Sequence, residues 1–119
     1  MSLCGLKVLV VEDEALVSMM VEDFLDELGC EVVGTASRLD EAIEKASSMT
    51  IDAAVLDVNL AGDLSYPVAE ILRARHIPFL FATGYGVEGL PGDLNGAAVL
   101  SKPYQIEALE TALCVATGR

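Results

Sequence analysis

The sequence predicts an α/β fold, a doubly wound parallel sheet of five strands with helices on both faces. Short apolar runs alternate along the chain with stretches whose apolar residues recur at helical spacing. The run at residues 53–56 shows no polar–apolar alternation, which is typical of a strand covered on both faces. Strands and helices in regular alternation, joined by right-handed crossovers, build this kind of sheet.

The expected strands are apolar and often β-branched. They lie at residues 7–11, 31–36, 52–57, 77–82 and 97–100. Apolar stripes predict helices within residues 17–28, 39–46, 68–72 and 106–116. Gly29 ends the first helix as a C-cap residue would, and Ser65-Tyr66-Pro67 begins the third with a capping hydroxyl and a proline in its first turn.

The connection between the fourth and fifth strands is unusual. A helix is expected there, yet the segment is rich in helix breakers. These are Gly84, Gly86, Gly89, Pro91, Gly92 and Gly96. We therefore expect this fourth helix to be short, frayed or disordered.

Composition narrows the class of protein. A chain of 119 residues suits a single domain over 1–119, and 53% hydrophobic residues exclude a disordered tail. The net charge of −12 argues against nucleic acid as a direct partner. No apolar run approaches the ~20 residues of a membrane span, and no secretion signal is visible. The cysteines Cys4, Cys30 and Cys114 form neither a disulfide framework nor a metal motif, which predicts a cytoplasmic protein.

Polar residues follow most of the expected strands. Glu12 and Asp13 follow the first, Asp57 ends the third, Thr83 follows the fourth and Lys102 follows the fifth. In a parallel sheet these ends share one edge, where ligands bind. Clustered carboxylates repel one another, and a bound Mg²⁺ would neutralise part of their charge because it takes oxygen ligands. A carboxylate can also attack phosphorus, a reaction that needs positioning and neutralisation of charge.

Each of these residues alone has a plainer interpretation. Asp57 could merely cap the next turn, and the acidic residues 12–14 favour the N-terminus of a helix. Lys102 alone would usually be a solvated lysine. Tyr104 is expected to pack at the sheet edge or on a partner-binding face, and the pair Met19-Met20 to fill the core.

Four motifs in order carry a resemblance to a known family. VLVVEDE, VLDVNL, FATG and SKPY together resemble the response-regulator receiver domain, a CheY-like fold, over nearly the whole chain. The resemblance implies strand order 2-1-3-4-5. It implies that Asp57 accepts a phosphoryl group from a sensor histidine kinase or a phosphotransfer protein. It also implies that Thr83 and Lys102 bind phosphoryl oxygens, and that Lys102 and Pro103 are joined by a cis peptide bond.

The same resemblance implies a magnesium site. Asp13 and Asp57 would bind Mg²⁺ directly, the main-chain carbonyl of Asn59 would complete the protein ligands, and Glu12 would act through water. The protein would be no enzyme beyond its own phosphorylation and dephosphorylation. Its oligomeric state stays open.

A narrower resemblance concerns FATGYG at residues 81–86, with PVAE at 67–70 and IPF at 77–79. These are similar to the FATGUY receivers, which often stand alone and pair with HWE-type kinases. The chain would then be a stand-alone regulator or a phosphate shuttle or sink. The alternative is a receiver cut from a longer hybrid kinase or regulator.

Two positions depart from the usual receiver pattern. Val99 stands where most receivers carry an aromatic that swings inward on activation, and Ala61 stands where most carry proline. Because valine has no ring to swing, we expect the switch to lie in residues 84–96 and to act on the face formed by residues 84–104.

Three rival functions remain at this stage. A haloacid-dehalogenase-type phosphatase would place DxD after the first strand and carry a cap, whereas Asp57-Val58-Asn59 follows the third. A flavodoxin-like FMN carrier would need a hydroxyl-rich loop where this chain has residues 12–14. A pseudo-receiver used only for docking would not need the complete set of acids, threonine and lysine that this chain carries.

Overall fold

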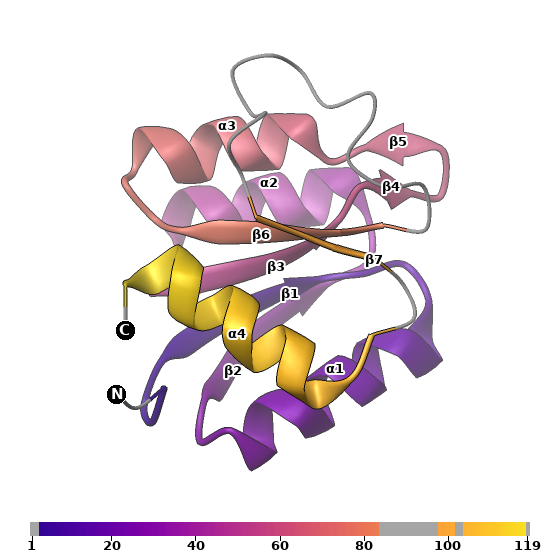
Figure 1. The fold of residues 1–119 in the computed structure, drawn as a ribbon. Coiled ribbons are helices and arrows are strands. Elements are labelled where there is room, and N and C mark those ends of the chain that lie inside the picture. The colour runs from indigo at the N-terminus through magenta and orange to yellow at the C-terminus, as the bar shows by residue number, and fades with distance from the viewer. Residues whose placement is uncertain (1–2, 84–97, 102–103, 119) are drawn as a thin grey trace.

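The computed structural model describes residues 3–83, 98–101 and 104–118. Its centre is a sheet of five parallel strands in the order β2-β1-β3-β6-β7 (Figure 1). The strands are β1 (Lys7–Val11), β2 (Glu31–Ala36), β3 (Ala53–Asp57), β6 (Phe79–Thr83) and β7 (Ala98–Ser101). β6 and β7 are the expected fourth and fifth strands, so the predicted fold class and strand order are confirmed.

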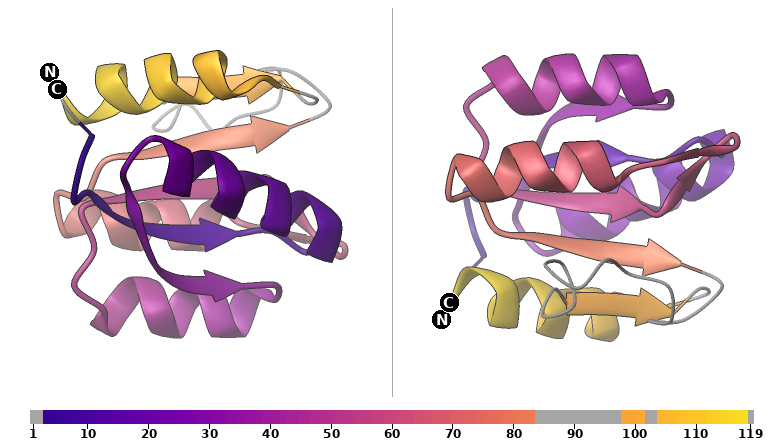
Figure 2. Two further views of the ribbon diagram at one scale, coloured as in Figure 1. Left: turned by 90° about the horizontal axis from the view of Figure 1, so that it is seen from below. Right: turned by 90° about the horizontal axis from the view of Figure 1, so that it is seen from above.

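Helices cover both faces of this sheet. They are α1 (Ala15–Glu27), α2 (Leu39–Ser48), α3 (Tyr66–Ala74) and α4 (Ile106–Thr117). α1 and α4 lie on one face, and α2 and α3 lie on the other (Figures 1 and 2). The helix expected to be short or disordered falls in residues 84–97, outside the part of the chain that the structure describes.

Alternate strand residues build two separate core layers. Val8 and Val10 point into the layer beneath α1 and α4, while Leu9 and Val11 point into the layer beneath α2 and α3. This alternation is the period of two of an extended chain. Because both layers are apolar, the strands carry no polar face, as the sequence pattern indicated.

Two ends of the chain meet at the edge of the sheet opposite to the carboxyl ends of the strands. The described parts of the chain near the two ends lie on the same side of the molecule in Figures 1 and 2. Leu3 packs in the same core layer as Leu113 of α4.

Gly29 follows α1 with a φ of 85°, and a Cβ there would come within 3.3 Å of the Cys4 Cα. The predicted glycine stop of the first helix is confirmed.

Ser65 begins α3 as predicted, with Pro67 in the first turn, but its hydroxyl does not cap the helix. The backbone of Ser65 has φ −83° and ψ 6° rather than the extended values that aim a capping side chain at the helix amides. Its Oγ is buried and has no hydrogen-bond partner among the residues that the structure describes. The capping bond expected from the sequence is therefore wrong.

A small hairpin after β3 was not predicted. It pairs β4 (Asn59–Leu60) with β5 (Asp63–Leu64) in antiparallel register. The two turn residues, Ala61 and Gly62, both have positive φ, at 52° and 99°. Two such residues between paired strands form the turn that matches strand twist, usually of type I′. Leu60 is 1% exposed and anchors the hairpin in the core.

The exposed side of α1 carries apolar residues. Met19 is 59% exposed and Leu16 is 81% exposed, so the expectation that Met19 fills the core is wrong. These residues lie three apart on the helix and share the face turned from the sheet.

Among the described residues, no helix combines the length and the apolar character needed to cross a membrane.

Candidate functional site

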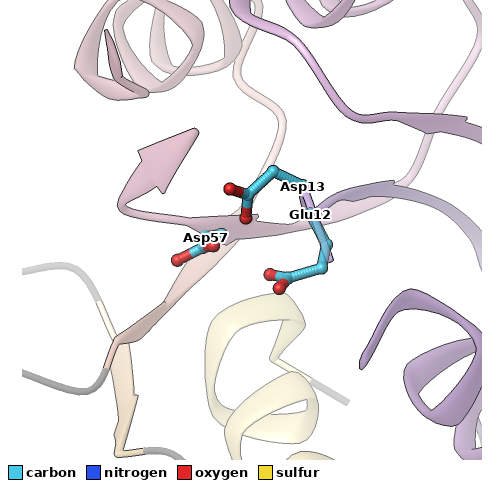
Figure 3. A group of neighbouring side chains, drawn as sticks. All are labelled: Glu12, Asp13 and Asp57. Atoms are coloured by element: carbon cyan, nitrogen blue, oxygen red, sulfur yellow. The ribbon is translucent and has the colours of Figure 1, made fainter. Parts of the chain in front are cut away.

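Three carboxylates meet at the carboxyl edge of the sheet. Glu12 and Asp13 follow β1, and Asp57 is the last residue of β3. β1 and β3 are hydrogen-bonded neighbours in which Val11 pairs with Leu56, so their ends lie at the same height. One ligand oxygen from each carboxylate lies within 4.8 Å of the others (Figure 3). The structure brings these three acids together, as the sequence predicted.

Burial makes this cluster unusual. Glu12 is 6% exposed and Asp57 is 8% exposed, whereas Asp13 is half-buried. Charged carboxylates resist burial and resist one another unless other groups compensate them. A donor set made only of carboxylate oxygens suits a hard divalent cation, and Mg²⁺ commonly uses one or two of them while keeping several waters. The residues present therefore fit a magnesium ion.

Main-chain hydrogen bonds hold the loops that carry these acids. The Glu12 N–H donates to the Ala36 carbonyl at 2.9 Å, and the Val58 N–H donates to the Ala82 carbonyl at 3.4 Å. The Ala61 N–H donates to Asp13 Oδ2 at 3.0 Å, which joins the β1–α1 loop to the hairpin. Asn59 begins β4, two residues beyond Asp57, so its main chain belongs to the same edge.

A groove of about 290 Å³ opens beside Glu12 and Asp13, toward the loop between β2 and α2. Thr35, Ser37 and Glu41 line its far side. The Ser37 N–H donates to Glu41 Oε1 at 3.0 Å, and this hydrogen bond is the largest cause of the lowered pKa of Glu41. The groove thus continues the acidic character of the edge, which the sequence did not reveal.

Thr83 and Lys102 were predicted at the same edge. Thr83 is the last residue of β6, which neighbours β3, and it pairs with Ser101 of β7. Asp57 pairs with Ala82, so the main chain of Thr83 lies one residue beyond the level of Asp57. The side chain of Thr83 lies outside the described part of the structure, as do Lys102, Pro103 and the peptide bond between them. Their roles stay predictions.

Tyr104 lies in the core below the acidic cluster, at 8% exposure. Burial raises the pKa of Tyr104 to about 12, with smaller contributions from the charges of Glu12 and Asp57. The side chain therefore packs inward rather than on an exposed partner-binding face. Val99 is half-buried and packs against the opposite core layer.

Comparison with known proteins identifies the family. A family model described as the response regulator receiver domain matches residues 8–114. The chain belongs to this family. It is a receiver of the kind found in the response regulators of two-component systems, with a CheY-like fold.

Two relatives of this receiver come from bacteria. The solution structure of SdrG from Sphingomonas melonis Fr1 is 43% identical, with a TM-score of 0.82 over 96% of this chain and 97% of that one. The transcriptional regulatory protein PdtaR of Mycobacterium tuberculosis is 33% identical over 95% of this chain. The receiver spans only 57% of the length of PdtaR.

One more neighbour supports the fold alone. The receiver domain of the sensor histidine kinase PA1611 from Pseudomonas aeruginosa PAO1 is 24% identical, with a TM-score of 0.83 over 98% of this chain and 100% of that one. In that crystal structure a magnesium ion is coordinated in the active-site cleft.

Two further features of the site are not signalled by the sequence. The bond from the Ala61 N–H to Asp13 joins residues 48 positions apart and uses a main-chain atom, which no residue type signals. Tyr104 lies close enough to Glu12 and Asp57 for their charges to contribute to its raised pKa. Only the position of Tyr104 directly after Lys102-Pro103 hinted at it.

Proposed function

We propose that this receiver accepts a phosphoryl group on Asp57 from a sensor histidine kinase or a phosphotransfer protein. The observation that carries the proposal is the buried Asp57 carboxylate at the end of β3, with oxygens of Glu12 and Asp13 within 4.8 Å. A nucleophile so placed needs charge neutralisation and positioning more than it needs covalent assistance.

The acidic cluster would hold one Mg²⁺. Asp13 and Asp57 would bind it directly, the main-chain carbonyl of Asn59 would add a further ligand, and Glu12 would act through water. When bound, the ion neutralises negative charge on the phosphoryl oxygens. The compact set of carboxylate oxygens supports this assignment.

The chain's own residues would then carry out the transfer. An Asp57 oxygen forms a bond to phosphorus while the bond from phosphorus to the donor imidazole nitrogen breaks, and the imidazole leaves with the electron pair. The Thr83 hydroxyl donates a hydrogen bond to one phosphoryl oxygen, and the Lys102 ammonium pairs with another. Water later hydrolyses the acyl phosphate and restores Asp57. No separate substrate is turned over, so the protein would act as a signalling receiver rather than as an enzyme.

A narrower role is part of the proposal. FATGYG at residues 81–86 supports membership of the FATGUY group and pairing with an HWE-type kinase. The protein would act in the cytoplasm as one receiver domain over 1–119, either as a stand-alone regulator or as a phosphate shuttle or sink. Phosphorylation would switch the face formed by residues 84–104. The alternative is a receiver within a longer regulator, and it is supported by the fact that this chain covers only 57% of the length of PdtaR.

Phosphorylation by a small donor tests the proposal directly. Wild type, Asp57→Asn and the control Asp63→Asn are incubated with acetyl phosphate or phosphoramidate, in Mg²⁺ or in EDTA, and their intact masses are measured. We expect one added phosphoryl group on wild type and on Asp63→Asn, in Mg²⁺ only. Equal modification of Asp57→Asn would refute the assignment of Asp57.

A further inference from the structure

The hairpin of β4 and β5 touches the acidic cluster through one main-chain atom. The Ala61 N–H donates to Asp13 Oδ2 at 3.0 Å, across 48 positions of sequence. Asp13 is the least buried of the three carboxylates, and it stands on a loop between β1 and α1 rather than within either element. This bond is therefore what orients Asp13 on the side of the hairpin.

Ala61 occupies an uncommon backbone conformation to make this bond. Its φ of 52° lies in the left-handed region, where a Cβ is disfavoured and where glycine or asparagine is usual. Such conformations persist only where the surroundings hold them. Here the Gly62 N–H donates to Asn59 Oδ1 at 2.7 Å, and the side chain of Leu60 is buried in the core.

We propose that the Ala61 N–H is a positioning group for Asp13, so that the β4–β5 hairpin sets the affinity of the acidic cluster for a divalent cation. The inference rests on the proposed function, because it takes Asp13 as a ligand of Mg²⁺. It goes further by assigning a task to a main-chain atom of the hairpin, outside the carboxylates themselves.

The chemistry of a carboxylate allows both interactions at once. Its two oxygens offer about four lone-pair sites, so Asp13 can accept the Ala61 N–H and still bind a metal. Like charges on Glu12 and Asp57 push the more exposed Asp13 outward, and the N–H dipole opposes that push. Hydrogen-bond partners of ligating carboxylates typically raise metal affinity about 10- to 100-fold.

The test replaces the Ala61 amide by an ester, through incorporation of the α-hydroxy analogue of alanine. This change removes the N–H and keeps the methyl group and the chain length. We expect the dissociation constant for Mg²⁺ to rise by about tenfold or more. The matched control Ala61→Gly keeps the N–H and tolerates positive φ, so it should keep the wild-type affinity. Proline at this position could test neither point, because it cannot adopt positive φ.

Affinity is measured on unphosphorylated protein by competition of Mg²⁺ against Tb³⁺ luminescence, and melting in EDTA reports whether each variant is folded. A second measurement needs no variant. In wild type, Mg²⁺ should slow the hydrogen exchange of the Ala61 amide more than that of Gly62, whose N–H bonds to Asn59.

The outcomes separate the two proposals. An ester variant with wild-type affinity, or an Ala61 amide whose exchange ignores Mg²⁺, overturns the positioning role and leaves the phosphorylation of Asp57 intact. A wild-type protein that is phosphorylated by acetyl phosphate but binds no Mg²⁺ overturns the positioning role and the metal assignment together. Weaker binding in the ester with unchanged binding in Ala61→Gly supports the inference.

Discussion

Asp13→Asn should have opposite effects on stability with and without metal. The substitution removes one charge from the cluster of Glu12, Asp13 and Asp57 and keeps an oxygen that can accept the Ala61 N–H. Without metal, the neutral side chain relieves repulsion and should stabilise the fold. With Mg²⁺, the loss of a ligand should remove the stabilisation that the ion gives to wild type.

The geometry sets the size of the first effect. Two unit charges 4.8 Å apart, the largest spacing within the cluster, repel by about 3 kcal/mol at an effective dielectric constant of about 20. Asp13 takes part in two such pairs, but it is half-buried, so water and salt screen both. We therefore expect Asp13→Asn to raise the metal-free free energy of unfolding by about 2 kcal/mol. For 119 residues this is a rise in Tm of about 8 °C.

Binding sets the size of the second effect. A ligand at a hundredfold excess over Kd adds about 2.7 kcal/mol to the stability of the state that binds it. Wild type should therefore melt about 10 °C higher in Mg²⁺ than in EDTA. Asp13→Asn should gain little, and the two proteins should approach each other in Tm or exchange order when the ion is added.

Calorimetry or circular dichroism melts in low salt, with EDTA or with saturating Mg²⁺, measure both effects. Asp63→Asn is the matched control, because Asp63 is an exposed carboxylate on β5 outside the cluster. It loses the same formal charge and should behave as wild type. A lower Tm for Asp13→Asn than for wild type in EDTA would refute the repulsion argument. A gain in Mg²⁺ equal to that of wild type would show that Asp13 is no ligand.

Two further changes test the surroundings of the site. Folding raises the pKa of Tyr104 to about 12. In the unfolded chain the phenol has a pKa of about 10 and therefore loses its proton at a lower pH. The free energy of unfolding should fall as the pH rises from about 10 to about 12. Tyr104→Phe should lessen that fall by about 2 kcal/mol in urea unfolding at about pH 9 and pH 12, and an unchanged fall would contradict the assignment. Ser65→Ala removes a buried hydroxyl with no partner among the described residues, so unfolding in urea should show a change between zero and a gain of about 1 kcal/mol, and a clear loss would reveal a missed hydrogen bond.

The sheet was predictable because its strands are largely apolar. β1 and β2 have the predicted bounds, since both contain adjacent β-branched valines and are followed by charged or turn-forming residues. β6 begins at Phe79 rather than at residue 77 as expected. Pro78 has no N–H to donate to the ladder, although its carbonyl accepts the Ala54 N–H at 3.1 Å.

The acidic cluster was predictable for a different reason. Parallel strands end at one edge, so polar residues that follow neighbouring strands must meet. The hairpin was not predictable, because Ala61 has no intrinsic preference for the positive φ that it adopts. The hydrogen bond to Asp13, 48 positions away, and the burial of the neighbouring Leu60 hold it there. The exposure of Met19 was not predicted, because an apolar residue next to the apolar stripe of a helix can face either the core or the solvent.

The neighbouring positions of the two termini have a consequence for rearranging the chain. The ends meet at the edge of the sheet away from Asp57, and Leu3 and Leu113 share one core layer. A short linker between the ends would therefore close the chain without crossing the acidic edge. New ends could be opened at the exposed turn around His76, which connects α3 to β6 at the same remote edge. The fold is in this sense compatible with circular permutation, in which the order of the elements along the sequence changes while the carboxylates keep their places.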